Sequence, residues 1–344
     1  MKRHNQILAA VLVVQIILSV VVFWPRSAAL AEREPLFPDL EVDDIVALTI
    51  TGGATSPDAR SMSAPSTSEG EDKSITLQQV EEDWILPDAD DYPAQANKVT
   101  SLLEKIVGLE TGRLVTRTDA SHKRLQVASD DFARRIDFET AGGETHTLYL
   151  GSSPSYGAIH FRVEGQSEVY LASDINTYET GAAAASWVDP TYLNVPQGDV
   201  TAVTLENENG QFTFVKDDAG EEGGGNWTME GLGADETLDE GRVDALLRQA
   251  ALVNMIEPLG KEDQPEYGMH EPGAVVTLST EEKTVTLRVG AKDPDDNSYV
   301  VTSSESPYYV RVAEYNVKEL VENAREDFLQ QEPTPTPEAN ADES

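Results

Sequence analysis

The sequence predicts an α+β protein with an N-terminal transmembrane helix and two tandem related units, each a mostly antiparallel sheet with one packed amphipathic helix. Three observations predict this class: an apolar stretch near the N-terminus, a set of features that occurs twice in the same order, and strand-like segments joined by short turns. A parallel doubly wound sheet needs a helix between most of its strands. The sequence does not supply these helices, so we expect antiparallel pairing.

The stretch from Ile7 to Trp24 contains 18 uncharged residues and is expected to form the transmembrane helix. In helical form it spans roughly 27 Å, which is close to the thickness of the hydrocarbon core of a bilayer. Lys2 and Arg3 precede it, and this positive charge predicts that residues 1–6 are cytoplasmic. We therefore expect a single-pass protein of the cell membrane that contacts the lipid bilayer through residues 7–24, with its body extracytoplasmic.

A cleaved signal peptide is the alternative, because Ala29–Ala31 resembles a small-x-small processing site. The apolar run is longer than the usual signal-peptide core of about 7–15 residues, which favours a retained anchor. Both interpretations place the body of the protein outside the cytoplasm.

Composition excludes several classes of function. Residues 25–344 carry 23 basic and 62 acidic residues, for a net charge of −39. Such a surface repels nucleic acid, so no nucleic-acid partner is expected. Solubility or a salty habitat accounts for the acidity, and a surface for cations or for a basic partner is the alternative. The absence of cysteine excludes disulfides, thiolate metal sites and cysteine nucleophiles.

An internal repeat organises the exported part. Asp44–Ile50 and Asp199–Leu205 are similar strand-like segments, and each is followed by a second strand that leads to a tryptophan, Trp84 or Trp227. A helix with one apolar face comes next in each copy, because apolar residues recur at positions i, i+3, i+4 and i+7. These faces are formed by Val99, Leu102, Leu103 and Ile106 in the first copy and by Val243, Leu246, Leu247 and Ala250 in the second. The equivalent tryptophans are expected to pack in the core, with ligand-stacking platforms as the alternative.

The correspondence continues beyond the helices, where Gly151 and Tyr170 precede Gly290 and Tyr309 by the same 139 positions. The predicted organisation therefore follows from the duplication together with the composition of the connecting segments. It comprises a first α+β unit at 36–190 with a disordered insertion at 52–72, a second α+β unit at 195–330, and a disordered acidic, proline-containing tail at 331–344.

An ordered set of features comprises the anchor, Asp44–Ile50, Trp84, the Val99–Val107 helix and Glu266–Pro272. In these features the chain resembles the bacterial DUF4340 family, and Glu266–Pro272 is similar to the family's Tyr-Gly-Leu-x-x-Pro signature. The first copy lacks a Tyr-Gly-x-x-x-Pro segment. The family has no established biochemical activity, and the resemblance implies a membrane-anchored protein that is auxiliary to an ABC-type transport or gliding-associated complex. It supplies no catalytic residue and no cofactor.

A search for chemistry gives only one pair of ligand-site candidates, His160 and Arg162, which share one face of a strand and suit an anion. Exposed sheet residues are the favoured interpretation of this pair. Two acidic segments, Asp88–Asp91 and Asp293–Asn297, offer oxygen ligands for Ca²⁺ but lack the spacing of a calcium loop, and solvated turns are favoured. We predict no catalytic, cofactor-binding or metal-binding residue.

The sequence thus favours a non-enzymatic scaffold or binding subunit. Two alternatives stay open: an envelope hydrolase or Ca²⁺-dependent enzyme with a dispersed site, and a solute-binding receptor that uses a cleft between the two units.

Overall fold

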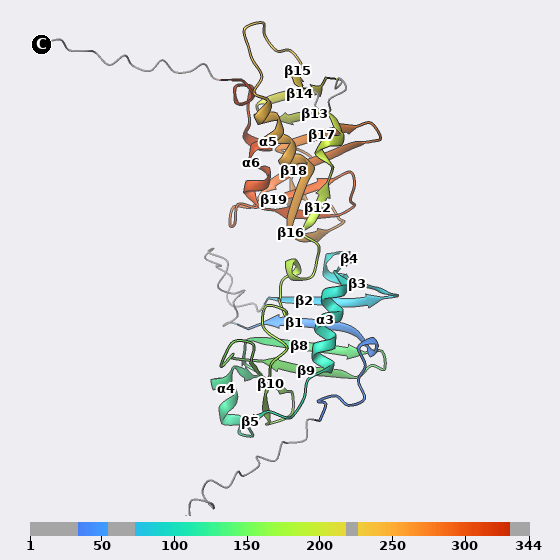
Figure 1. Ribbon diagram of the computed structural model, residues 1–344, viewed down its shortest axis with the longest axis vertical. Coiled ribbons are helices and arrows are strands. Elements are labelled where there is room, and N and C mark those ends of the chain that lie inside the picture. Colours follow the sequence, from blue (N-terminus) through green and yellow to red (C-terminus); the bar gives the residue numbers. More distant parts are fainter. Residues whose placement is uncertain (1–33, 54–72, 218–225, 331–344) are drawn as a thin grey trace, which may run out of the picture. The chain divides into compact units, whose positions relative to one another are not determined.

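The computed structural model describes residues 34–53, 73–217 and 226–330 (Figure 1). The predicted anchor at 7–24, the predicted tail at 331–344 and nearly all of the predicted insertion at 52–72 lie outside the described residues. Gly52 is described and is the last residue of strand β1, so the prediction that the disordered insertion begins at this residue is wrong. No helix within the described ranges is long and apolar enough to cross a bilayer.

The first sheet has nine strands in the order β4-β3-β2-β1-β8-β9-β10-β11-β5. The ladder from β1 through β8 to β5 is antiparallel throughout. The strands are β1 (Ile45–Gly52), β2 (Ser74–Val80), β3 (Asp83–Leu86), β4 (Tyr92–Pro93), β5 (Leu114–Thr116), β8 (Arg134–Thr140), β9 (Thr145–Leu150), β10 (Ile159–Val163) and β11 (Val169–Ala172). Two short strands, β6 (Val127–Ala128) and β7 (Asp131–Phe132), form a separate hairpin.

The second sheet also has nine strands, in the order β12-β16-β20-β19-β18-β17-β13-β14-β15, and is antiparallel throughout. The strands are β12 (Thr191–Asn194), β13 (Val200–Asn207), β14 (Gly210–Lys216), β15 (Trp227–Met229), β16 (Leu252–Gly260), β17 (Ala274–Thr280), β18 (Thr284–Lys292), β19 (Tyr299–Ser303) and β20 (Tyr309–Val312).

The two sheets repeat one strand order. Read from β3 to β5, the first sheet matches the second read from β15 to β16, with eight strands in equivalent places. A register shift falls between Ile45 and Ala47 where β1 pairs with β8. The equivalent shift falls between Val200 and Ala202 where β13 pairs with β17. A bulge of this kind depends on local backbone geometry, so its recurrence at the same place confirms the duplication.

One long helix comes after the opening strands of each copy: α3 (Ala96–Val107) follows β4 in the first, and α5 (Glu240–Ala251) follows β15 in the second. All eight residues of the two predicted apolar faces are at most 3% exposed, as the periodicity predicted. In Figure 1 helix α3 lies across the strands of the first sheet. The chain then enters the strand at the far end of the shared strand order, β5 at the edge of the first sheet or β16 next to the edge strand β12 of the second, which the sequence did not predict.

Shorter helices complete the two copies. Helix α4 (His122–Leu125) precedes the β6–β7 hairpin, and α6 (Glu314–Glu322) follows the last strand of the second sheet. Helix α6 contacts α5, and a 3-10 helix, η7 (Arg325–Phe328), places Phe328 against Phe212 and Phe214. These C-terminal residues therefore belong to the core of the second copy.

The chain divides into two compact units, one from residues 1–60 and 100–180 and the other from residues 61–99 and 181–344. The first sheet lies within the 36–190 expected for the first unit, whereas strand β12 comes from the segment between the two expected ranges. Contacts explain why residues near 90 group with the second unit. The Asp90 carboxylate accepts a hydrogen bond from the Lys261 N–H at 2.6 Å, and the Tyr308 hydroxyl donates to the Asp91 carbonyl at 2.9 Å.

Candidate functional site

His160 and Arg162, the two predicted ligand-site candidates, both lie on strand β10 and are 8% and 5% exposed. The interpretation of this pair as exposed sheet residues is therefore wrong. The His160 Nδ1 atom lies 2.7 Å from the carbonyl oxygen of Ser152 and 3.1 Å from its hydroxyl. The ring is thus held by the turn that follows β9.

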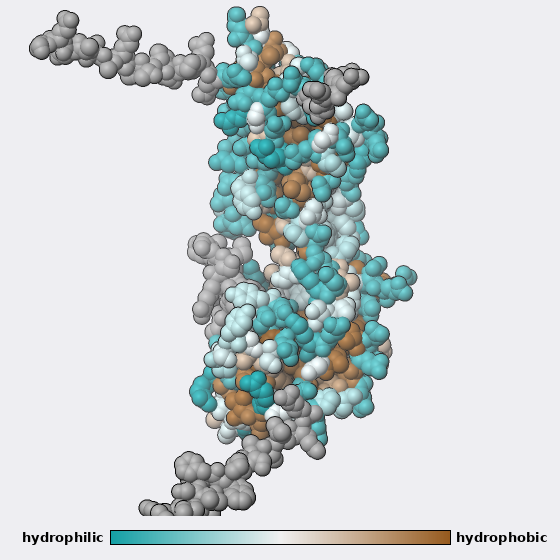
Figure 2. Space-filling model, in the orientation of Figure 1, coloured by the Kyte–Doolittle hydropathy of each residue, from teal (hydrophilic) through white to brown (hydrophobic). Residues whose placement is uncertain are grey.

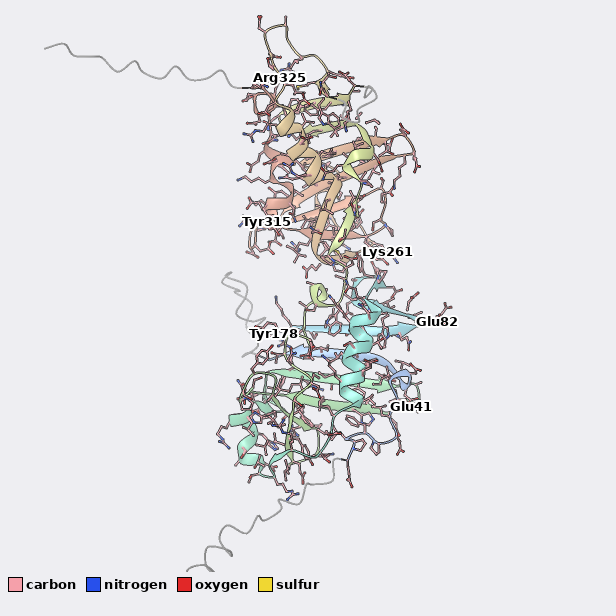
Figure 3. All side chains as sticks on the ribbon, viewed as in Figure 1. Glu41, Glu82, Tyr178, Lys261, Tyr315 and Arg325 are labelled. Carbon is pink, nitrogen blue, oxygen red and sulfur yellow. The ribbon has the colours of Figure 1, made fainter. Side chains whose placement is uncertain are left out.

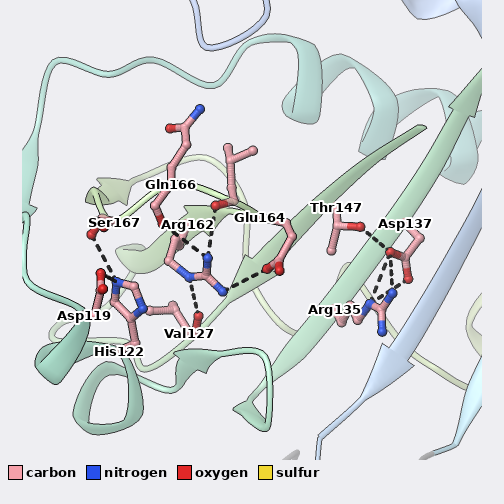
Figure 4. A network of polar contacts seen from close by, with 11 residues as sticks. Asp119, His122, Val127, Arg135, Asp137, Thr147, Arg162, Glu164, Gln166 and Ser167 are labelled. Atoms are coloured by element: carbon pink, nitrogen blue, oxygen red, sulfur yellow. Dashed lines mark hydrogen bonds and ion pairs between the residues drawn. The ribbon is translucent and has the colours of Figure 1, made fainter. Parts of the chain in front are cut away.

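Arg162 is surrounded by acceptors from its own unit (Figure 4). Its Nε donates to the Val127 carbonyl at 2.7 Å, and its Nη1 donates to the Val163 and Gln166 carbonyls at 3.2 Å each. Its Nη2 donates to the Glu164 carboxylate at 3.2 Å. Charge-assisted bonds of this kind fix the side chain, so the geometry supports a structural role for Arg162.

The face of each sheet that carries Tyr149 and Arg162 in the first copy, and their equivalents in the second, is called here the outer face. In the first copy the outer face is closed. The guanidinium of Arg162 lies 4.6 Å from the centre of the Tyr149 ring. A small second core covers this region and consists of Leu125, Val127, Phe132, Tyr149 and Val169. Side chains from α4 and the β6–β7 hairpin thus fill the space above the strands.

In the second copy the outer face holds a pocket of about 470 Å³. Strands β18, β19 and β20 provide the floor of this pocket, and the segment after β16 provides one wall. The lining residues are Asp263, Met269, His270, Thr286, Arg288, Thr302, Ser303, Ser304 and Tyr309. This volume falls within the range of about 300–1,000 Å³ that is usual for small-molecule sites.

Strand register shows that the closed region and the pocket are equivalent places. Tyr149 pairs with Arg135 and with Arg162 across its neighbouring strands. Arg288 pairs in the same way with Val275 and with Thr302. Arg288 and Thr302 therefore occupy the positions that Tyr149 and Arg162 fill in the first copy.

A tight crossing positions the wall of the pocket. The 3-10 helix η6 (Pro265–Tyr267) ends at Gly268, whose φ of 66° lies in the left-handed region that glycine adopts readily. The chain then passes over Gly290, where a Cβ atom would lie 2.1 Å from the Tyr267 carbonyl oxygen and 2.9 Å from Met269 Cε. Glycine at 290 thus allows Met269 to lie against the sheet, where it is 5% exposed.

Two exposed residues of opposite charge, Arg288 and Asp263, line the pocket without a partner among the described residues. Within residues 34–53, 73–217 and 226–330, the side chains of Arg288 and Asp263 form no hydrogen bond or ion pair. Burial raises the pKa of Tyr309, the Asp263 carboxylate raises it further, and the Arg288 guanidinium acts in the opposite direction. Both charged groups therefore act on the same tyrosine hydroxyl from within one pocket.

The acidic turns have internal roles. Asp90 caps the Lys261 N–H, and Asp293 forms an ion pair with Arg311 at 2.8 Å. In the part of the chain that the structure describes, no three histidine or acidic side chains converge as metal ligands would. Trp84 and Trp227 are 5% and 6% exposed, as expected for core residues.

No local pattern of the sequence marks the pocket. His270 lies within the Glu266–Pro272 segment, and Arg288 lies two residues before Gly290. One signal was available, because the constant offset of 139 positions aligns Arg288 with Tyr149. A change from an aromatic residue to a cation at equivalent places of a repeat indicates that the two surfaces differ.

The fold and the pocket define a class of protein: a duplicated α+β module in which the second copy has an open, polar outer face. The chain belongs to the family described as Domain of unknown function (DUF4340), whose model matches residues 84–257 and residues 227–342. The two matches begin at Trp84 and Trp227, the tryptophans of the equivalent strands β3 and β15. No curated protein and no solved structure matches the chain.

Proposed function

We propose that the protein is a non-enzymatic, membrane-anchored extracytoplasmic scaffold or binding subunit that presents two related α+β units to a membrane complex. The duplication supports this proposal most strongly. Both copies keep the strand order and the buried helix face, while the outer face is closed in one copy and open in the other. A module that conserves its core and varies its surface is suited to presenting two different surfaces.

Surface chemistry supports a partner of basic character. The net charge of residues 25–344 is −39, and hydrophilic residues dominate the face seen in Figure 2. Tyr178 and Tyr315, labelled in Figure 3, are 85% and 76% exposed and lie in different units. Tyrosine is enriched where proteins contact one another, and long-range charge attraction speeds the association of a basic partner.

The anchor gives the proposed setting. Residues 7–24 carry the protein in the membrane, and the excess of positive charge before them keeps residues 1–6 in the cytoplasm. This part is tested by alkaline extraction of membranes, from which the full chain should not be released. A variant with V13R and I17R should be released, because each charge at the centre of a span costs about 2.5–3.5 kcal/mol. Release of the unaltered chain would contradict the anchor.

The partner that we propose is an ABC-type transport complex or a gliding-associated complex, which the resemblance noted in the sequence implies. Mild crosslinking of intact membranes, followed by purification of the tagged full chain, should recover subunits of such a complex at a constant ratio. The Y178A and Y315A variants should lower this recovery, whereas L232A, at a position that is 36% exposed, is the matched control. Consistent recovery of the protein alone would refute the proposal. The hydrolase and cleft-receptor interpretations stay predictions that no contact in either unit favours.

A further inference from the structure

We propose that the outer-face pocket of the second unit binds a small zwitterion, an amino acid or a short peptide, with its carboxylate at Arg288 and its ammonium group near Asp263. This goes beyond the scaffold role, and it requires neither the anchor nor a protein partner.

The opposite charges in the pocket carry the inference. Arg288 offers a planar guanidinium that matches a carboxylate with two parallel hydrogen bonds, and no side chain among the described residues occupies those donors. Asp263 lies at the same pocket and is likewise unpaired. A plain anion satisfies Arg288 but is repelled by Asp263. A molecule with both a carboxylate and an ammonium group satisfies both.

The charge of the whole chain favours the same class of ligand. With a net charge of −37, the protein repels free anions at long range. A zwitterion has no net charge, so its approach carries no such penalty. Its two charged groups then meet Arg288 and Asp263, which are both exposed, only at short range where these residues line the pocket.

The rest of the lining suits a polar molecule with a small apolar part. Hydroxyl groups come from β18, β19 and β20, including those of Thr286, Thr302 and Tyr309. Met269 and the Tyr309 ring provide apolar surface, and the Tyr309 ring lies 5.4 Å from the ring of Tyr267. Thr286 and Tyr309 have no hydrogen bond from their hydroxyl groups to any described residue, so these groups are available to a ligand.

In the first copy the same place is closed. There Tyr149, the equivalent of Arg288, is 3% exposed and its ring centre lies 4.6 Å from the guanidinium of Arg162, whose Nε, Nη1 and Nη2 atoms each donate to atoms of its own unit. The difference between the copies lies in the side chains of the outer face, since the strand order is shared. The two copies therefore differ at the outer face and not in the arrangement of their strands.

The test is isothermal titration calorimetry on the detergent-solubilised full chain. The ligands are a panel of proteinogenic L-amino acids and the dipeptide L-alanyl-L-alanine. Acetate and methylammonium serve as probes that carry only one of the two charges. We expect at least one zwitterion to bind, and both single-charge probes to bind at least about tenfold more weakly. R288Q and D263N should each weaken binding of the zwitterion at least about tenfold.

Matched controls are R248Q, on the exposed side of α5, and D235N, in an exposed turn, and both should leave binding unchanged. R288Y copies the closed arrangement of the first unit and should abolish binding while the near-ultraviolet circular dichroism stays native. Absence of binding by every zwitterion would overturn the proposal. Acetate binding as tightly as the zwitterion, or binding that survives R288Q and D263N, would overturn it as well.

Discussion

The carbonyl oxygen of Tyr267 faces Gly290 so closely that a Cβ atom at residue 290 would lie 2.1 Å from it. The first copy repeats this relationship, because a Cβ atom at Gly151 would lie 2.1 Å from the Leu125 carbonyl oxygen. Gln126, with a φ of 56°, takes the left-handed conformation that Gly268 takes in the second copy. The segment around Gln126 is therefore the structural counterpart of the Tyr-Gly segment, although the first copy lacks that sequence.

Replacement of either crossing glycine should destabilise its unit. We expect G290A and G151A each to lower the free energy of unfolding by about 1–3 kcal/mol, because the new methyl group overlaps a backbone oxygen that cannot move freely. Denaturant unfolding of the solubilised full chain measures the loss. The matched control is G198A, where a Cβ atom meets nothing within 4 Å. A stability of G290A equal to that of G198A would contradict the crossing.

Arg162 should act on stability. We expect R162M to lower the free energy of unfolding by about 1–3 kcal/mol, because the Val127 and Gln166 carbonyls lose their charged donor. The control is R117M, since the Arg117 side chain is 72% exposed and its ion pair with Glu168 spans 3.7 Å. That change should cost about 1 kcal/mol or less. Equal losses in the two variants would show that the bonds of Arg162 are not structural.

The tryptophans of the described residues should be shielded from solvent. Trp84, Trp187 and Trp227 are each at most 6% exposed. In a W24F background, which leaves these three as the only tryptophans of the chain, we expect blue-shifted fluorescence and weak quenching by acrylamide. Unfolding in denaturant should make quenching strong and serves as the internal reference. Strong quenching in the native state would instead favour the ligand-platform interpretation of Trp84 and Trp227.

Tyr92 should make stability depend on pH in the alkaline range. Burial, followed by the nearby Tyr192 and Asp189, raises the pKa of Tyr92 from 10.0 to about 12. Because the folded-state pKa is above the unfolded one, this stabilising contribution is complete below pH 10 and is lost as the pH rises toward 12. Y92F should lose less stability than the unaltered chain across this window, as measured by denaturant unfolding. Y156F, at a fully exposed position, should behave like the unaltered chain.

The sequence alone predicted much of the fold. The spacing of Leu102 and Leu103 in one helix, and of Leu246 and Leu247 in the other, predicted which helix faces are buried, because the period of a helix fixes which side chains share a face. The similar alternation of apolar and polar residues in Asp44–Ile50 and Asp199–Leu205 predicted two equivalent strands, because alternate side chains of a strand share a face. The uncharged stretch at 7–24 stays a prediction of the membrane anchor, since it lies outside the described residues.

Only the tertiary structure decided which residues surround Arg162 and Arg288. Alternation along β10 and β18 shows that Arg162 and Arg288 face one side of a sheet, but their surroundings depend on segments that are distant in the sequence. The Val127 carbonyl holds Arg162 in a closed face, whereas Met269 and Asp263 border an open pocket around Arg288. Local periodicity fixes the direction of a side chain, and strand pairing and chain crossings fix its neighbours. The candidate site therefore depends on contacts between segments that are distant in the sequence, although the offset of 139 positions already aligns Arg288 with Tyr149.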